Sequence, residues 1–502
     1  MLRRSALFAT AALAAAALAL TACTGSTPDP TPTGEIDPDA TLVVGIPLEP
    51  TNLDIRVTTG AALEQLLIDN IYQGLVTRDA ENAVVPALAS EWDVAEDGLT
   101  YTFTLQEGVT FHDGAAMTSA DVVDSLTTAK DDETIQGHGD LAAVETITAP
   151  DAQTVVLTLS EPDINLLFNL TGRGGLVFKT GDTTDRKTAE NGTGPFTLGQ
   201  WRQGDSITLE RYADYWGEPA GVAEVVVNYI PDFSAGVNAA LDGSLDVLTA
   251  VDPNLSSRLD DVNGFTLVRG ETTDKGTLAF NQSQPPLDDV RVREALRLAV
   301  DREALTTTQG SSAPLYGPIP ELDPGYEDLS DVVDFDIERA KELLAEADAE
   351  DLELTLTIPS VYGSTIPTFL VSAYDAIGVT LAVKSVDFPT WLTDVYTNKD
   401  YDLSFVLHVE SHDFGNFANP EYYFTYDNPE VQSLYADALA TTDQEESAAL
   451  LAEAARIVSE DHAADWLYIA QTITAIGPGV SGFPVNSINV RLNLADVTVS
   501  GE

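Results

Sequence analysis

The stretch that decides the fold reads PALASEWDVAEDGLTYTFTLQEGVTFHDGAAMTSADV and spans residues 86–122. Within it, residues 99–105 alternate large apolar side chains with threonines, which is typical of a strand with one buried face. The DG turn at residues 97–98 predicts that this strand pairs with residues 92–94. Residues 118–121 (TSAD) have the spacing of a capping box, so a helix is predicted to follow.

Strands and helices alternate along the rest of the chain. Strands are predicted at residues 41–46 and 352–358, and helices at residues 61–72, 429–438 and 444–460. This alternation predicts an α/β fold. The chain of 502 residues is longer than one hydrophobic core usually serves, so two or three domains are expected.

The N-terminus has the features of a secretory signal. A basic pair precedes an apolar run at residues 6–20, which is too short for a comfortable transmembrane helix. Residues 20–23 (LTAC) resemble a lipobox, after which bacterial lipoproteins are cleaved and lipidated, and Cys23 is the only cysteine of the chain. We expect a lipoprotein signal peptide over residues 1–22. Over residues 23–39 we expect the lipidated cysteine and a flexible tether rich in Pro, Thr and Asp.

The charge of the chain excludes several classes of partner. Its 81 acidic and 24 basic residues give a net charge of −57. Removing residues 1–22 takes away two arginines and no acid, so the mature charge is 22 − 81 = −59. Such an acidic surface repels nucleic acid and anionic lipid headgroups. We therefore expect no nucleic-acid partner, and contact with the membrane only through the lipid on Cys23.

Short blocks in a fixed order carry a resemblance to a known family. Five of them fall within the first stretch: PALASEW (86–92), DG (97–98), YTF (101–103), GVTFHDG (108–114) and ADV (120–122). Others follow at GTGPF (192–196), YW (215–216), PLDDVRVREAL (286–296) and AVDR (299–302). Together they resemble the solute-binding proteins of bacterial oligopeptide, dipeptide and nickel ABC importers, family 5.

The resemblance implies a two-lobed, periplasmic-binding-protein-like (type II) fold with a hinge between the lobes and a third, inserted domain. Lobe I would combine residues 40–76, 190–277 and 479–502. The inserted domain would take residues 77–189, and lobe II residues 278–478. Ligand binding would then select a closed form of the two lobes.

The same resemblance implies a receptor rather than an enzyme. The expected protein is a monomer, lipid-anchored to the outer face of the cytoplasmic membrane and without a cofactor. It would capture a peptide or similar amine-bearing solute and deliver it to a membrane permease with its ATPase. A secreted hydrolase is the alternative from another class, but the sequence lacks a Gly-x-Ser-x-Gly elbow, a His-Glu-x-x-His motif and a P-loop lysine motif. A peptide-pheromone receptor or chaperone without transport would share the fold.

Residues 401–424 (YDLSFVLHVESHDFGNFANPEYYF) are the strongest candidate for the ligand site. A buried strand is predicted to turn polar at His408, Glu410 and His412, which would share one face because strand side chains alternate. Asp413 and several aromatic residues follow, as in the wall of a ligand cleft. A strand edge that has reached solvent is the alternative interpretation.

Two ligand chemistries suit this cluster. In peptide-binding members of the family, an aspartate before a "DP..FL"-like block holds the α-amino group of the peptide. Residues 419–424 (NPEYYF) resemble that block, which points to Asp413, with Glu410 as a substitute because the spacing is longer and Asn replaces Asp. Alternatively His408, Glu410 and His412 could bind nickel or zinc, directly or through a chelate.

Four further ligand-binding candidates lie near the family's inter-lobe blocks or add an aromatic wall: Tyr72, Thr193, Asn281 and Trp391. The turn at residues 192–195 is predicted to let two backbone segments approach closely. The acidic segment at residues 323–336 is predicted to be a solvated loop.

Overall fold

The computed structural model describes residues 34–487 and 490–501. The predicted signal peptide, Cys23 and most of the predicted tether lie outside the described residues. Within the described part of the chain, no helix is both long enough and apolar enough to cross a membrane.

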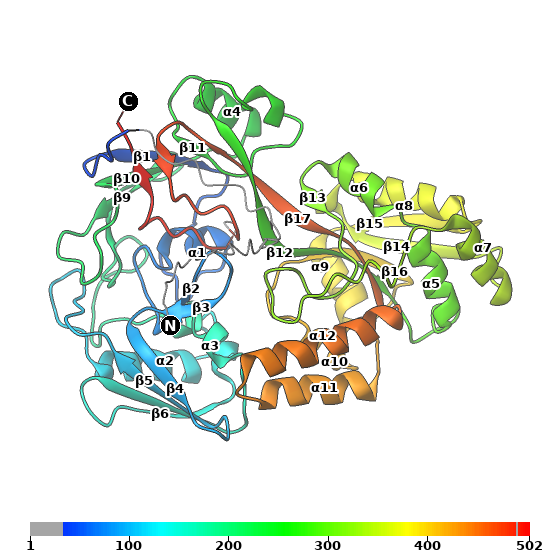
Figure 1. The fold of residues 1–502 in the computed structure, drawn as a ribbon, viewed down its shortest axis with the longest axis horizontal. Coiled ribbons are helices and arrows are strands. Elements are labelled where there is room, and N and C mark those ends of the chain that lie inside the picture. The colour runs from blue at the N-terminus through cyan, green and yellow to red at the C-terminus, as the bar shows by residue number, and fades with distance from the viewer. Residues whose placement is uncertain (1–33, 488–489, 502) are drawn as a thin grey trace, which may run out of the picture. The chain divides into compact units, whose positions relative to one another are not determined.

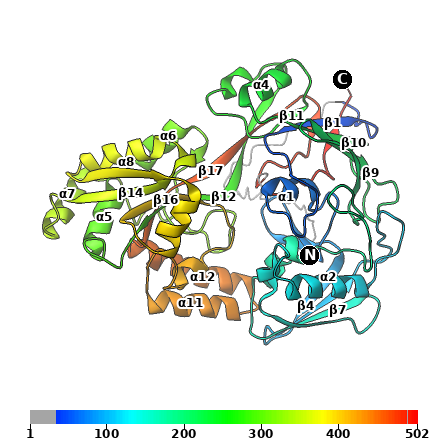
Figure 2. The same cartoon turned by 180° about the vertical axis from the view of Figure 1, so that it is seen from behind.

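One large mixed sheet runs through both predicted lobes. Its strand order is β15-β14-β16-β12-β17-β11-β1-β10-β9-β8. The bounds are β15 (Thr380–Val386), β14 (Glu353–Pro359), β16 (Leu403–His408), β12 (Thr266–Phe280), β17 (Ala464–Ile476), β11 (Val247–Leu248), β1 (Thr41–Ile46), β10 (Glu224–Tyr229), β9 (Ser206–Arg211) and β8 (Phe196–Arg202), and the short β13 (Ser312–Ala313) pairs with β17. The long antiparallel strands β12 and β17 lie side by side (Figures 1 and 2). They connect a first group of strands, β11-β1-β10-β9-β8, with a second group, β15-β14-β16.

A separate antiparallel sheet confirms the reading of the first stretch. Its order is β4 (Ala89–Val94), β5 (Thr100–Leu105), β7 (Thr154–Leu159) and β6 (Val144–Thr148). Alternate residues of β5, including Phe103, are buried, as the threonine alternation predicts. The helix α2 (Ser119–Asp131) begins at the predicted capping box, with Thr118 as its N-cap and Asp121 completing the reciprocal bonds.

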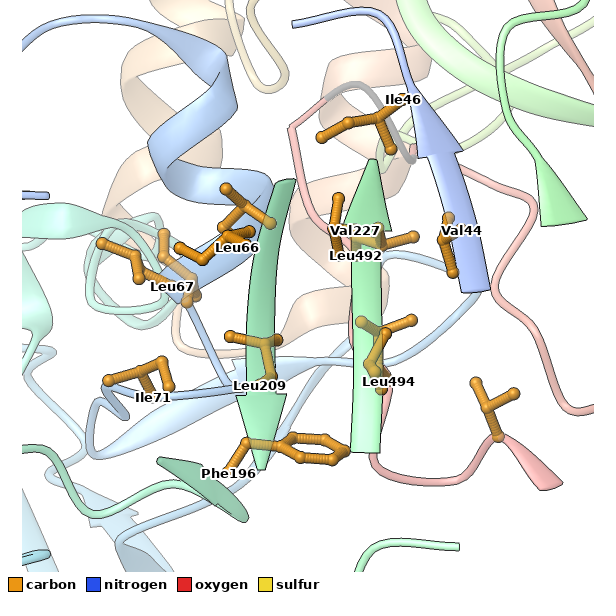
Figure 3. Close-up of a cluster of buried hydrophobic side chains, with 14 of the residues drawn as sticks. Val44, Ile46, Leu66, Leu67, Ile71, Phe196, Leu209, Val227, Leu492 and Leu494 are labelled. Atoms are coloured by element: carbon orange, nitrogen blue, oxygen red, sulfur yellow. The ribbon is translucent and has the colours of Figure 1, made fainter. Parts of the chain in front are cut away.

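Buried apolar side chains, among them Leu66, Phe196 and Leu492, form the core around β1, β10 and β9 (Figure 3). The glycine-rich turn at residues 192–195 leads directly into β8. A Cβ atom at Gly192 would lie 1.9 Å from the carbonyl oxygen of Ile71, so this predicted close approach is confirmed. The helix α1 (Ala61–Leu67) is shorter than the predicted 61–72. It ends early because the chain turns at Asp69, whose φ is +64°, and the Ile71 carbonyl then accepts the amides of Thr193 and Gly194 instead of helical ones.

Helices pack on the second group of strands. They are α5 (Val290–Leu298), α6 (Arg302–Gln309), α7 (Ile337–Glu346), α8 (Thr365–Asp375), α11 (Pro429–Ala440) and α12 (Gln444–Glu460). The fully buried Asp465 pairs with two buried arginines, at 3.4 Å from Arg297 Nε and in a short contact with Arg302. These pairs tie α5 and α6 to β17.

The remaining elements are short. They are β2 (Val76–Arg78), β3 (Val84–Pro86), β18 (Val480–Ser481), β19 (Thr498–Val499), α3 (Leu166–Asn169), α4 (Phe233–Leu241), α9 (Phe388–Trp391), α10 (Gly415–Ala418), the π-helix η5 (Leu392–Thr397) and the 3₁₀ turns η1 (His138–Leu141), η2 (Arg173–Gly175), η3 (Ser256–Arg258) and η4 (Ser360–Tyr362).

Candidate functional site

The polar segment after β16 does not continue as a strand. β16 ends at His408, and the following residues form turns in which His412 has a left-handed φ of +57°. The prediction that His408, Glu410 and His412 share one strand face is therefore wrong. Because the alternation of a strand stops with its last ladder pair, the three side chains go to different surroundings.

A buried lysine that the sequence reasoning missed lies beside Asp413. Lys275 on β12 is paired with His408 on β16, and its side chain is 3% exposed. Its ammonium lies 3.1 Å from Asp413 Oδ1, donates to the carbonyl of Glu410 at 2.8 Å and donates to that of Thr273 at 3.1 Å. The available signal was a lone lysine in the Thr-rich and apolar segment TTDKGTLAF.

His408 is held as a neutral imidazole beside this ion pair. Its Nε2 lies 2.9 Å from the Tyr423 hydroxyl, and its Nδ1 lies 4.0 Å from Asp413 Oδ2. Burial and the nearby Lys275 ammonium lower the pKa of His408 to about 4. At neutral pH the imidazole therefore contributes hydrogen-bonding capacity and no charge.

The group that could hold a metal ion differs from the predicted one. Ligand atoms of His408, Glu410 and Asp413 all lie within 4.8 Å of one another, so Asp413 takes the place expected for His412. The Lys275 ammonium, 3.1 Å from Asp413 Oδ1, would repel a divalent cation bound there. The donor set is thus suitable in type, while its electrostatic surroundings oppose a metal.

His412 turns toward the loop around α3. Its ring stacks on Phe168 with a centroid distance of 3.7 Å, and its Nδ1 lies 3.1 Å from Asn165 Oδ1. The guanidinium of Arg78 lies over the Phe168 ring, at 4.7 Å. Burial in this contact and the charge of Arg78 lower the pKa of His412 to about 3.

Asp323 holds the segment after β16 from the other side. Its carboxylate accepts the backbone N–H of His412 at 2.9 Å, a short bond from the Ser411 hydroxyl, and a bond from Asn82 Nδ2 at 3.4 Å. The residue is 6% exposed, so the prediction of a solvated loop is wrong at this position. Burial raises the pKa of Asp323, while Lys275 acts to lower it.

A small pocket lies between the segment after β16, the turn before α3, residues 318–324 and the helices α11 and α12. Its polar side is made by Asn165, Asp323, His412 and Asp413. The other lining residues are mainly apolar: Ile164, Pro318, Ile319, Pro324, Phe414, Tyr435, Ala438, Leu439, Ser447 and Leu451. An apolar cavity with a few convergent polar groups is typical of small-molecule sites.

The four other sequence candidates are absent from this lining, as far as the described residues show. Trp391 is buried and donates from Nε1 to Ser404 Oγ at 2.9 Å. Asn281 donates to the carbonyls of Lys399 and Tyr401. The remaining two lie elsewhere: Thr193 donates to Gln73 Oε1, and Tyr72 packs its ring against Phe178.

Two groups of strands joined by β12 and β17, with a mixed polar and apolar pocket, define a two-lobed solute-binding protein. The profile described as "Bacterial extracellular solute-binding proteins, family 5 Middle" matches residues 83–433. The chain belongs to this family, whose members are solute-binding receptors.

Relatives and solved structures agree with this assignment. The chain is 27% identical to the glutathione-binding protein GsiB of Pectobacterium atrosepticum over 479 residues, covering 89% of this chain and 91% of GsiB. It is 29% identical to the dipeptide-binding protein of Escherichia coli over 296 residues, covering 53% and 55% of the two chains. Several curated relatives are thus matched over less than two thirds of their length.

The solved structure of HbpA2 from Haemophilus parasuis has the same fold. It superposes with a TM-score of 0.84 at 21% identity and covers 92% of this chain and 100% of HbpA2.

Proposed function

We propose that this protein is an extracellular receptor that captures a peptide or peptide-like solute in the pocket lined by Asp323, His412 and Asp413, and delivers it to an ABC importer. The observation that carries the proposal is that pocket, in a chain whose relatives include ABC-transporter binding proteins for peptides. Its apolar walls suit side chains, and its buried carboxylates suit a small number of orienting contacts.

The cellular setting is proposed from the sequence. Cleavage after residue 22 would leave Cys23 as the lipid attachment site, and the tether up to residue 39 would separate the receptor from the bilayer. The partners would be one solute, a permease and its ATPase, with the receptor acting as a monomer. Lobe I is proposed to comprise residues 40–76, 190–277 and 479–502.

Thermal unfolding tests the function directly. The full chain, purified in detergent, would be heated alone, with pooled di- to hexapeptides, and with nickel or zinc salts. A ligand at about 100 times its dissociation constant stabilises by about 2.7 kcal/mol, which would raise the unfolding temperature measurably. Stabilisation by peptides alone supports the proposal, and no response to any peptide pool contradicts it.

The contribution of the carboxylates is tested by substitution. If Asp413 or Glu410 contacts the solute, Asp413→Asn or Glu410→Gln should weaken peptide binding in isothermal titration. Unchanged binding in both variants would remove these two residues from the ligand site.

A metal-chelate receptor is the second candidate, because His408, Glu410 and Asp413 form a group of suitable donors. The Lys275 ammonium makes bare nickel or zinc the less favourable ligand. A flat titration with nickel and zinc salts would exclude direct binding of the bare ions.

A further inference from the structure

We propose that Lys275 is a built-in countercation for Asp413, so that the solute presents an uncharged, apolar end to this part of the pocket. For a peptide, that end would be an acylated or otherwise blocked amino terminus, instead of a free ammonium group. This inference rests on the proposed receptor function and narrows its ligand class.

The first support is that the Lys275 ammonium occupies the place in which a ligand ammonium would be held. An ammonium group has three N–H donors. In Lys275 they face three acceptors, namely Asp413 Oδ1 and the carbonyls of Glu410 and Thr273, all at 2.8–3.1 Å. The lysine is therefore saturated by the protein, and it holds the carboxylate that the family resemblance assigns to the peptide amine.

The second support is the charge balance of the buried groups. The carboxyl groups that line the pocket are those of Asp323 and Asp413, and burial keeps the neighbouring His412 neutral. Burial raises the pKa of both carboxyl groups, while the Lys275 ammonium acts to lower it. Two cations act on them: Lys275 on both, and Arg78 on Asp323. Both carboxyl groups therefore already face a protein cation, and burial disfavours their charged forms, so the pocket attracts a further cation only weakly.

The third support is the chemistry of the apolar residues that line the pocket. Ile164, Ile319, Phe414, Leu439 and Leu451 face the same cavity. A ligand ammonium here would lose water, approach a fixed lysine charge and gain only a carboxylate that is already paired. An acyl or aliphatic group carries no charge that must lose its water, and burial of its apolar surface stabilises the complex. The exposed Glu410 could offer a ligand cation only a solvent-screened contact.

The experiment compares one pool of tripeptides with free amino termini and the same pool after N-acetylation. Stabilisation against heat is measured for the full wild-type chain and for Lys275→Met, and affinities are then measured by titration. We expect the wild type to respond to the acetylated pool at least as well as to the free pool. In Lys275→Met, Asp413 becomes available, so affinity for free amines should rise about tenfold or more, the usual scale of a hydrogen bond to a charged group.

Further variants separate a direct effect from a structural one. Lys275→Met combined with Asp413→Asn should abolish the new preference for free amines. Lys275→Gln, which keeps a polar side chain of similar length, replaces Lys275→Met if that variant does not fold. Lys341→Met is the matched control, because Lys341 is exposed on α7 and pairs only with Glu338 at 3.0 Å among the described residues; it should leave the preference unchanged.

A wild type that binds the free pool and rejects the acetylated pool overturns the inference. If no variant responds to either pool, the proposed peptide function fails, and n-butylammonium decides the role of Lys275 separately. Stabilisation of Lys275→Met, but not of wild type, by n-butylammonium would support the inference, because the added amine would replace the lost ammonium beside Asp413. Failure of n-butylammonium to stabilise Lys275→Met would overturn it.

Discussion

Lowering the pH should destabilise the folded protein through His412, whose neutral ring stacks on Phe168 and lies beside Asn165. In an unfolded chain a histidine has a pKa of about 6.5, whereas burial and the Arg78 guanidinium lower the pKa of His412 in the folded protein to about 3. Above pH 6.5 the imidazole is neutral in both states, so the contact contributes fully. As the pH falls below 6.5 the unfolded state binds a proton first, and stability is lost progressively until the folded pKa is reached.

The size of the effect follows from these two pKa values. At pH 5, keeping the imidazole neutral costs RT ln(1 + 10^1.5), which is about 2 kcal/mol. His408 and His462, whose pKa values burial lowers to about 4 and about 3, should add to the same slope. His412→Asn removes the ring while keeping a side chain that tolerates the left-handed φ of +57°. Between pH 7 and pH 5, the free energy of unfolding of this variant should fall by up to about 2 kcal/mol less than that of the wild type.

The assay is an NMR titration of ¹³C-labelled histidine, which is practical because the chain contains five histidines. The His412 resonance, assigned from the Asn variant, should remain that of a neutral imidazole from pH 8 to pH 5. Urea unfolding at pH 7 and pH 5 then measures the stability difference. A His412 resonance that titrates near pH 6.5 would refute the reasoning. His138→Gln is the control, since His138 lies outside this contact and bonds the Ala129 carbonyl.

Three other substitutions test the packing that positions the site. Gly192→Ala should destabilise the protein by about 1–3 kcal/mol, because the new Cβ would meet the Ile71 carbonyl and the two segments would have to separate; chemical denaturation measures this. Asp465→Asn should cost about 3–5 kcal/mol, because it leaves its two arginine partners buried without a countercharge; the same denaturation experiment checks it. Asp323→Ala should speed hydrogen exchange of the backbone amide that it binds at 2.9 Å by about tenfold or more, as mass spectrometry of the segment after β16 would show.

Each of these substitutions has a matched control. Gly139→Ala adds a Cβ with no atom within 4 Å and should have a small effect. Asp394→Asn breaks an exposed pair with Lys384 at 3.0 Å, so a loss above about 1 kcal/mol would contradict the burial argument. If the Asp323→Ala variant exchanges its amides at the wild-type rate, this carboxylate does not hold the segment.

Local signals in the sequence were sufficient for much of the secondary structure. The alternation in β5 and the capping box at Thr118 were read correctly. These features depend on neighbours within a few residues, so the sequence contains all that is needed to recognise them. Helix α1 was predicted too long because its end depends on a distant glycine turn.

The sequence also marked the segment after β16 as the candidate site, while only the tertiary structure showed which groups surround it. Asp413 was recognised as a candidate from the residues around it. Lys275, the partner of Asp413, was not recognised from the sequence. It lies far from this segment along the chain, 135 positions before Glu410, and reaches the segment only because β12 pairs with β16. Strand register, and the point at which a strand ends, follow from packing over the whole sheet. For that reason the sequence by itself determined the fold class and proposed where the ligand site lies, and the tertiary structure determined which charges near that candidate site are already paired.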